Sequence, residues 1–270
     1  MYLGGNCDVE LFYHLPPNLR LLSVQRVVAE EVDLRRKINH VKTLYIGSTT
    51  SLELIQLFPK LNRLGLYVNY NCSELKYISS CRSLKHLTLK MDPYPDNIFF
   101  LPLTLPKLVS LVLERIQIAD LDFLVNSPFL TSLSISNCKV VSRRFDPIWR
   151  LKRLTKLKLH NCNIEELEGI ETISDTLSTL QLHKCKVKDI RPISSMTALE
   201  TLDLYGSPVI DISPIGSVPT LKYLVPPKTI LQWSSLYVQN EKCRFPRRNF
   251  LSKHIHSKRG VRGYRVVLRK

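Results

Sequence analysis

The sequence predicts an α/β solenoid, in which short parallel strands and 3₁₀ segments alternate and stack along one axis. Three observations predict it. Leucine accounts for 45 of the 270 residues, one residue in six, which is well above ordinary usage. A leucine pattern recurs every 20 to 24 residues over most of the chain. Within the clearest copies, apolar residues first alternate at every second position and then recur at every third.

Ten Leu-x-x-Leu-x-Leu-like segments divide the chain into repeats. The clearest read LTKLKLHNCNIEELEGI, LSTLQLHKCKVKDIRPI and LETLDLYGSPVIDISPI. In the first of these, Leu157 and Leu159 are two positions apart, which is the period of a strand with one buried face. Each repeat is therefore expected to open with a strand whose leucines point into the stack. The ten segments start at Leu19, Val41, Leu61, Leu84, Leu108, Leu130, Leu154, Leu177, Leu199 and Leu221.

The second half of each clear repeat has a different period. Ile164, Leu167 and Ile170 are three positions apart, and the next two repeats keep this spacing. A period of three is that of a 3₁₀-helix, in which residues i and i+3 lie on one face. Pro192 and Pro214 fall between such apolar positions and disfavour a long α-helix there.

These repeats resemble the leucine-rich repeat family, over roughly residues 19 to 225 and most specifically in the C-terminal half. Their spacing is similar to that of the 22-residue subfamily found in phosphatase-regulator and splicing-factor proteins. The resemblance implies a leucine-rich repeat horseshoe, with parallel β-strands on the concave face and 3₁₀ or short helical segments on the convex face. It also implies a surface that binds a partner rather than an enzyme.

The chain is expected to have three parts: an N-terminal cap with a degenerate first repeat (1–40), the leucine-rich repeat solenoid (41–225) and a basic C-terminal extension (226–270). In the cap, PNLRLLSV reads as a first strand and VVAEEVDLRRKI as a charged amphipathic helix. LPPNLRLL also resembles the start of an F-box, although too few residues precede it for a complete one.

The charge is concentrated at the C-terminal end. The net charge is +16, and residues 227–270 hold 12 Lys/Arg residues against one acidic residue. That extension therefore carries +11, which leaves +5 for residues 1–226. Such a chain is expected to prefer acidic partners, whether nucleic acid, anionic membrane or acidic protein.

The cysteines and the N-terminal residues point to an intracellular protein. The seven cysteines include no CxxC pair, and MYLGGNCDVELFYHL lacks an apolar core of signal-peptide length. No apolar run approaches the roughly 18 residues of a membrane span. We therefore expect a reducing compartment (cytoplasm, nucleus or an organelle matrix), no secretion and no membrane contact.

The sequence favours neither a metal site nor catalysis. His160-x-Cys162 and His183-x-Cys185 look like paired metal ligands, but the resemblance to leucine-rich repeats implies that the histidines, at position seven of the repeat, lie on the exposed face and that the cysteines, at position nine, face inward. With Cys138, these cysteines are expected to form an inward structural ladder. No GxGxxG, Walker, GxSxG or HExxH motif is present. We expect no enzyme activity, no cofactor, no metal and no small-molecule substrate.

Two surfaces remain as candidate binding sites. On the concave face, basic and aromatic residues gather in the C-terminal repeats, as is typical of interface anchors. In the extension, arginines alternate with aromatic residues, a mixture suited to RNA or another polyanion. The concave-face residues are Lys156, Lys158, His160, Gln181, His183, Asp203, Tyr205 and Tyr223. The polyanion-binding residues are Arg244, Arg247, Arg248, Lys253, Lys258, Arg259, Arg262, Arg265 and Arg269.

The sequence thus predicts a non-catalytic binding scaffold. Its concave face would hold a protein or ribonucleoprotein partner, and its basic extension would contact an acidic surface such as RNA. The alternative is a pure protein-protein adaptor without nucleic-acid contact, resembling either a phosphatase regulator or the substrate receptor of a ubiquitin ligase. The fold alone does not decide between them.

Overall fold

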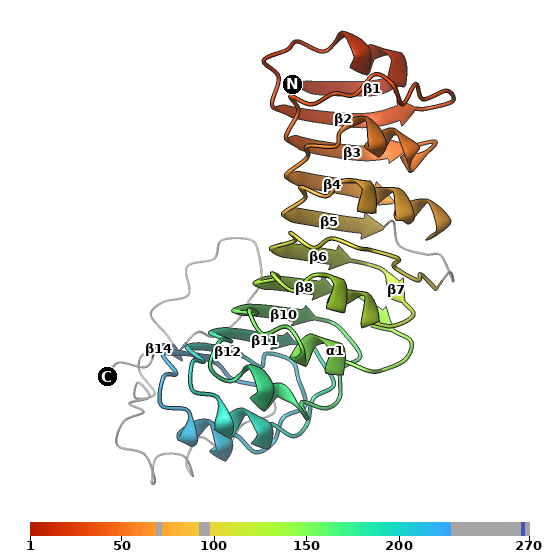
Figure 1. The fold of residues 1–270 in the computed structure, drawn as a ribbon. Helices are drawn as coiled ribbons and strands as arrows, with labels where there is room; N and C mark the ends of the chain where they lie inside the picture. Colours follow the sequence, from red (N-terminus) through yellow and green to blue (C-terminus); the bar gives the residue numbers. More distant parts are fainter. Residues whose placement is uncertain (69–71, 92–97, 228–265, 268–270) are drawn as a thin grey trace, which may run out of the picture. The chain divides into compact units, whose positions relative to one another are not determined.

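The computed structural model describes residues 1–68, 72–91, 98–227 and 266–267 (Figure 1). The chain forms two compact units, Met1–Leu154 (unit 1) and Thr155–Lys270 (unit 2). Each unit is built on parallel strands that follow one another in sequence order, with the short helices in the connections between them.

Unit 1 contains a parallel sheet of seven described strands, in the order β1-β2-β3-β4-β5-β6-β8. A smaller parallel pair, β7 with β9, joins two of the connections. The strands are β1 (Tyr2–Asp8), β2 (Leu21–Val28), β3 (Thr43–Thr49), β4 (Arg63–Val68), β5 (His86–Met91), β6 (Ser110–Glu114), β7 (Gln117–Ile118), β8 (Ser132–Ser136) and β9 (Lys139–Val140).

Unit 2 continues the same pattern with β10 (Lys156–His160), β11 (Thr179–His183), β12 (Thr201–Asp203) and β13 (Tyr223–Val225), all parallel. A short strand near the chain end, β14 (Val266–Val267), pairs antiparallel with β13. The register aligns Leu157, Leu180, Leu202 and Leu224 across the sheet. All four are buried, so the leucines of successive repeats stack into one core.

The repeat spacing predicts the strands accurately. Every strand from β2 to β13 in the two main sheets begins two residues after a predicted repeat start, as β11 does after Leu177. A backbone ladder fixes this register: the carbonyl of Ser178 accepts the amides of Glu200 and Thr201, and the carbonyl of Glu200 accepts the next pair. Each coil is therefore bonded to its neighbour at the same position.

The predicted 3₁₀ segments are also confirmed. Arg191–Ser195 (η6) begins where the Asp189 carboxylate accepts the Arg191 amide at 2.9 Å, and the buried Ile193 anchors it. No described helix is long and apolar enough to cross a membrane. The remaining helices are η1 (Val9–His14), η2 (Leu52–Leu57), η3 (Cys72–Ser80), η4 (Asp122–Asn126), α1 (Asp146–Trp149), η5 (Ile170–Ile173) and η7 (Ser213–Ser217).

The amphipathic helix predicted after the first strand is wrong. Its first residues belong to β2, and residues 29–40 form an irregular connection. The reason lies in hydrogen bonds to side chains, one local and one tertiary: the Asp33 carboxylate accepts the amide of Arg35 at 3.1 Å, and the Asp33 amide donates to the Tyr13 hydroxyl at 2.8 Å. These bonds use amides that a helix would pair with carbonyls one turn earlier.

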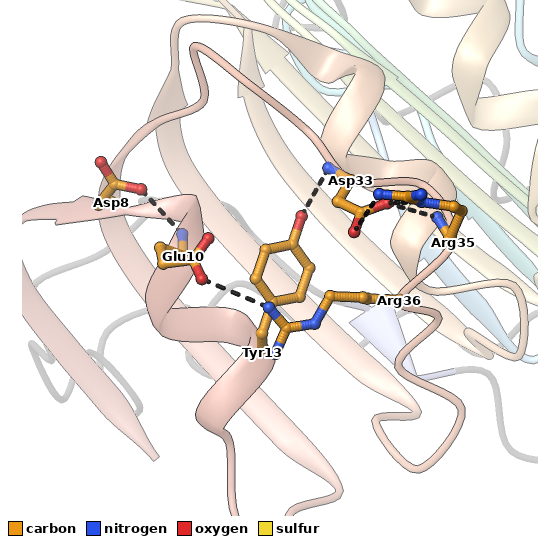
Figure 2. Close-up of polar contacts among 6 residues, drawn as sticks. All are labelled: Asp8, Glu10, Tyr13, Asp33, Arg35 and Arg36. Atoms are coloured by element: carbon orange, nitrogen blue, oxygen red, sulfur yellow. Dashed lines mark hydrogen bonds and ion pairs between the residues drawn. The ribbon is translucent and has the colours of Figure 1, made fainter.

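At the N-terminal end of unit 1, a polar cluster joins η1 to this connection (Figure 2). The Arg36 guanidinium lies 4.2 Å from the centre of the Tyr13 ring and 3.4 Å from the Glu10 carboxylate. Residues 2–14 form β1 and η1 rather than the α-helices of an F-box. The N-terminal segment thus adds a coil to the unit 1 sheet, since β1 pairs parallel with β2.

Candidate protein-binding surface

The exposed side chains of β10 to β13, together with Tyr205 just beyond β12, form what we call the unit 2 sheet face. Along each strand they alternate with the buried leucines, because successive side chains of a strand point to opposite sides. The register aligns Lys158, Gln181 and Asp203 in one row, and Lys156 with Tyr223 at the two ends of another. All eight residues predicted for the concave face therefore lie on this one surface. Their role in binding stays a prediction.

The most closely packed part of this surface is a ladder of His160, His183 and Tyr205. The two histidine rings meet edge to face, with ring centroids 4.4 Å apart, and Tyr205 lies 4.9 Å from His183. The Nδ1 atoms of the histidines are 2.7 Å apart, so one nitrogen donates a hydrogen bond and the other accepts it. Protonation of both rings would remove the acceptor.

Burial lowers the pKa of His160 below its ordinary value of 6.5. The charge of Lys184 lowers this pKa further, while Asp203 opposes the shift. The His160 ring is therefore more readily neutral near pH 7 than an ordinary histidine, and it contributes an aromatic rather than a cationic group to the ladder.

Charged groups lie on either side of the ladder. Lys156 and Lys158 are exposed on β10. Toward β13, the ammonium of Lys222 contacts the carboxylate of Glu200 at 2.6 Å. A carboxylate oxygen of Asp203 accepts the Tyr205 amide at 2.9 Å, which fixes the chain where β12 ends. The face thus combines the exposed cations of β10 with an aromatic strip, and Asp203 fixes the backbone of the last residue of that strip, Tyr205.

The predicted cysteine ladder is confirmed. Cys138, Cys162 and Cys185 are buried, each beneath the end of a strand. The Ile116 amide donates to the sulfur of Cys138 at 3.4 Å, and the thiol of Cys185 donates to a backbone carbonyl at 3.3 Å. Burial raises the pKa of Cys185 to about 12. Among the residues that the structure describes, no group of three or more His, Cys, Asp or Glu residues could hold a metal ion.

The nine basic residues predicted to bind a polyanion lie outside the described residues. Within the extension only Pro226, Pro227, Val266 and Val267 are described, and the pairing of the two valines with β13 joins them to the strand that carries Tyr223.

Unit 1 carries an exposed aromatic group that was not among the predicted binding residues. Tyr2, Tyr45 and Tyr67 are 70%, 36% and 39% exposed on its main sheet. Tyr45 and Tyr67 sit at the outward positions of the repeat pattern, so the two-residue period could have found them. Tyr2 belongs to β1, which the leucine pattern does not contain.

Comparison with known proteins bears on the fold. No family model and no curated protein matches the chain. Among solved structures, a leucine-rich repeat protein of Leptospira interrogans aligns with a TM-score of 0.60, at 18% identity over 82% of this chain and 57% of its own. An internalin of Listeria monocytogenes aligns with a TM-score of 0.59, at 20% identity over 80% of this chain and 66% of its own. The chain has the leucine-rich repeat fold.

A third structure with this leucine-rich repeat fold is the plant peptide hormone receptor RGFR1, solved in complex with RGF2. It aligns with a TM-score of 0.58, at 16% identity over 83% of this chain and 37% of its own. The chain thus spans less than two thirds of the length of each of these three proteins.

Proposed function

We propose that the chain is a non-catalytic leucine-rich repeat scaffold whose unit 2 sheet face holds a protein or ribonucleoprotein partner. The ladder of His160, His183 and Tyr205 carries the proposal. Rings that are packed on one another lose little conformational entropy when a partner covers them. Aromatic and basic side chains together are the types enriched at interface anchors, and Lys156 and Lys158 supply the charge beside the rings.

The comparisons support a binding role of this kind, since one solved structure with this fold contains a peptide hormone receptor and its ligand. The sequence adds the absence of any recognised catalytic motif. Within this proposal, the repeat spacing places the chain with the 22-residue subfamily of phosphatase-regulator and splicing-factor repeats, and the cysteine usage places it inside the cell. The three-part organisation (1–40, 41–225, 226–270) belongs to the same proposal.

The basic extension is proposed to contact an acidic surface such as RNA. Its charge of +11 supports this, as does the position of β14. Because Val267 pairs with Tyr223, the end of the extension returns to the edge of the unit 2 sheet. A partner seated on the unit 2 sheet face would then also lie near the end of the extension. A pure protein adaptor, resembling a phosphatase regulator or a ubiquitin-ligase substrate receptor, is the alternative, and it would need no such charge.

The anchors are tested by affinity purification from cell extract, with and without nuclease. Tyr205→Ala/Tyr223→Ala removes two rings from the unit 2 sheet face, and Val125→Ala/Ile210→Ala removes two exposed apolar side chains elsewhere. We expect the first variant to weaken its main protein partner by about 2 kcal/mol, roughly 30-fold in Kd, and the second to leave it unchanged. Equal recovery of the partner on both variants would refute the assignment of the unit 2 sheet face as the binding surface.

The extension is tested by fluorescence anisotropy with a labelled single-stranded RNA across a salt series. Replacing Arg247, Arg248, Arg262 and Arg265 by glutamine keeps β14, whereas ending the chain at Val225 would remove it. If each of these arginines neutralises one phosphate, the slope of log affinity against log salt should flatten by roughly 2 to 3. An unchanged slope, with partner recovery insensitive to nuclease, would favour the pure adaptor.

A further inference from the structure

One row of the unit 2 sheet face carries a cation, an amide and an anion in order. The register places Lys158 of β10 beside Gln181 of β11, and Gln181 beside Asp203 of β12. Lys158 is exposed, and the other two side chains are half-buried. We call these three residues the central row. Its charge is positive at β10 and negative at β12, so a complementary ligand carries opposite charges at the two matching positions.

Two other rows of side chains border the central row. On one side lies the ladder of His160, His183 and Tyr205, whose ring centroids follow one another at 4.4 and 4.9 Å. On the other side the register aligns Lys156, Thr179, Thr201 and Tyr223. A ligand that follows the central row therefore meets aromatic surface on one flank, and hydroxyl groups with a further ring on the other.

The separation of the two charges selects a conformation of the ligand. Adjacent strands lie about 4.8 Å apart, so Lys158 and Asp203 are about 9.6 Å apart across the sheet. A polyproline II segment has three residues per turn and rises about 3.1 Å per residue, which brings residues i and i+3 to the same side at about 9.3 Å. Side chains on one side of an extended strand recur at about 6.7 and 13.4 Å, and neither distance matches.

We infer that the central row binds a proline-rich segment in the polyproline II conformation, with an acidic residue over Lys158 and a basic residue three positions away over Asp203. The two residues between them turn toward the flanks, where proline rings pack on the aromatic ladder. The Gln181 amide donates to a main-chain carbonyl of the segment, because a polyproline II backbone has no internal hydrogen bonds. This inference rests on the proposed function, since it names the class of partner that the unit 2 sheet face holds.

Other ligands fit the central row less well. The main-chain carbonyls of an α-helix are already paired within the helix, so they offer Gln181 no acceptor. The phosphates of a nucleic acid would be repelled by the carboxylate of Asp203. That carboxylate accepts the Tyr205 amide at 2.9 Å, which holds the negative charge at its place in the row.

The test is fluorescence anisotropy of rhodamine-labelled octapeptides, amidated at the C-terminus, against the full chain. The matched peptide, Pro-Pro-Glu-Pro-Pro-Arg-Pro-Pro, places its charges three residues apart. The shifted peptide, Pro-Pro-Glu-Pro-Arg-Pro-Pro-Pro, has the same composition but turns the charges to different sides. Both sequences are neutral overall, so the +11 extension attracts neither through net charge. A third peptide replaces the arginine of the matched peptide with citrulline, which has a similar shape and no charge.

One variant removes the anion of the central row, and a matched control removes an anion elsewhere. Asp203→Asn keeps a side-chain oxygen that can accept the Tyr205 amide. The control is Asp211→Asn, because Asp211 likewise accepts an amide two residues along the chain, that of Ser213 at 2.8 Å, but lies outside the unit 2 sheet face. Circular dichroism checks that both variants are folded.

We expect the matched peptide to bind the unaltered chain roughly fivefold more tightly than the shifted peptide. Citrulline should raise the Kd roughly fivefold on the unaltered chain and on Asp211→Asn, but less than about twofold on Asp203→Asn, where the opposing charge is already missing. Equal losses on all three chains would overturn the inference. So would equal binding of the matched and shifted peptides, or no saturable binding of the matched peptide at about 1 mM.

These results are distinguishable from a failure of the proposed function. If the matched peptide fails while Tyr205→Ala/Tyr223→Ala loses its protein partner, the unit 2 sheet face is a binding surface and the inferred partner class is wrong. If Tyr205→Ala/Tyr223→Ala keeps that partner, the proposed function is wrong, and the peptide measurements alone decide whether the central row recognises a polyproline II segment.

Discussion

Leu180→Ala tests the register on which the fold rests. Leu180 is completely buried in β11, between Leu157 of β10 and Leu202 of β12. Truncation to alanine removes three carbon atoms from the core, about 2.4 kcal/mol at roughly 0.8 kcal/mol for each buried carbon. The cavity adds about 24 cal/mol per Å³ for the volume that does not collapse. We therefore expect a loss of about 3 to 5 kcal/mol in the free energy of unfolding.

Hydrogen exchange followed by mass spectrometry shows where this stability is lost. Each coil of a repeat protein contacts only its neighbours, so β10, β11 and β12 should lose most protection and β13 less. The matched control is Thr179→Ala, at the half-exposed position just before Leu180, with an expected change within about 0.5 kcal/mol. If Leu180→Ala costs no more protection than Thr179→Ala, the leucine does not point into the core and the register is wrong.

Three further predictions concern unit 2. Lys184 has a φ of 53°, in the left-handed region, which Asn adopts more readily than Lys. Lys184→Asn should therefore raise the free energy of unfolding by about 1 kcal/mol in urea titration. An equal or lower stability would contradict the assigned turn. Ser207→Ala should cost about 2 to 3 kcal/mol in the same assay, because the hydroxyl accepts the Cys185 amide and donates to the Leu182 carbonyl. Because the folded chain lowers the pKa of His160, the unfolded chain binds its proton more readily, and stability should fall as the pH drops below about 6.5; ring NMR titration that returns an ordinary pKa would refute this.

The repeat pattern predicts the strands because the leucines of every repeat must be buried, and burying them at equivalent positions fixes the register of neighbouring strands. One two-residue period places Leu157, Leu180 and Leu202 in the core and the residues between them on the surface. The 3₁₀ segments follow in the same way from apolar residues three positions apart.

The structure of the N-terminal segment could not be predicted by that rule. In β1 the described burial is limited to Cys7, so Tyr2–Asp8 has no periodic apolar signal and forms a strand because β2 offers it an edge. The connection after β2 looks amphipathic in sequence, but it does not form a helix. The amides of Asp33 and Arg35 donate instead to the side chains of Tyr13 and Asp33. Tertiary contacts decided both elements.

The candidate surfaces were predictable in position but not in geometry. Strand alternation places His160 and His183 on the exposed face in adjacent repeats. Their 2.7 Å contact depends on side-chain rotamers that sequence spacing does not specify.

The most direct test of the proposed scaffold function is site-specific photocross-linking in cells. A benzophenone amino acid replaces Tyr205 on the unit 2 sheet face in one variant and Ile210, which is 82% exposed, in the other. The account predicts that position 205 cross-links one dominant protein, that this product disappears when His183 is also changed to alanine, and that position 210 does not form it. Cross-linking of the same protein from both positions, or only from position 210, would contradict the assignment of the unit 2 sheet face as the binding surface.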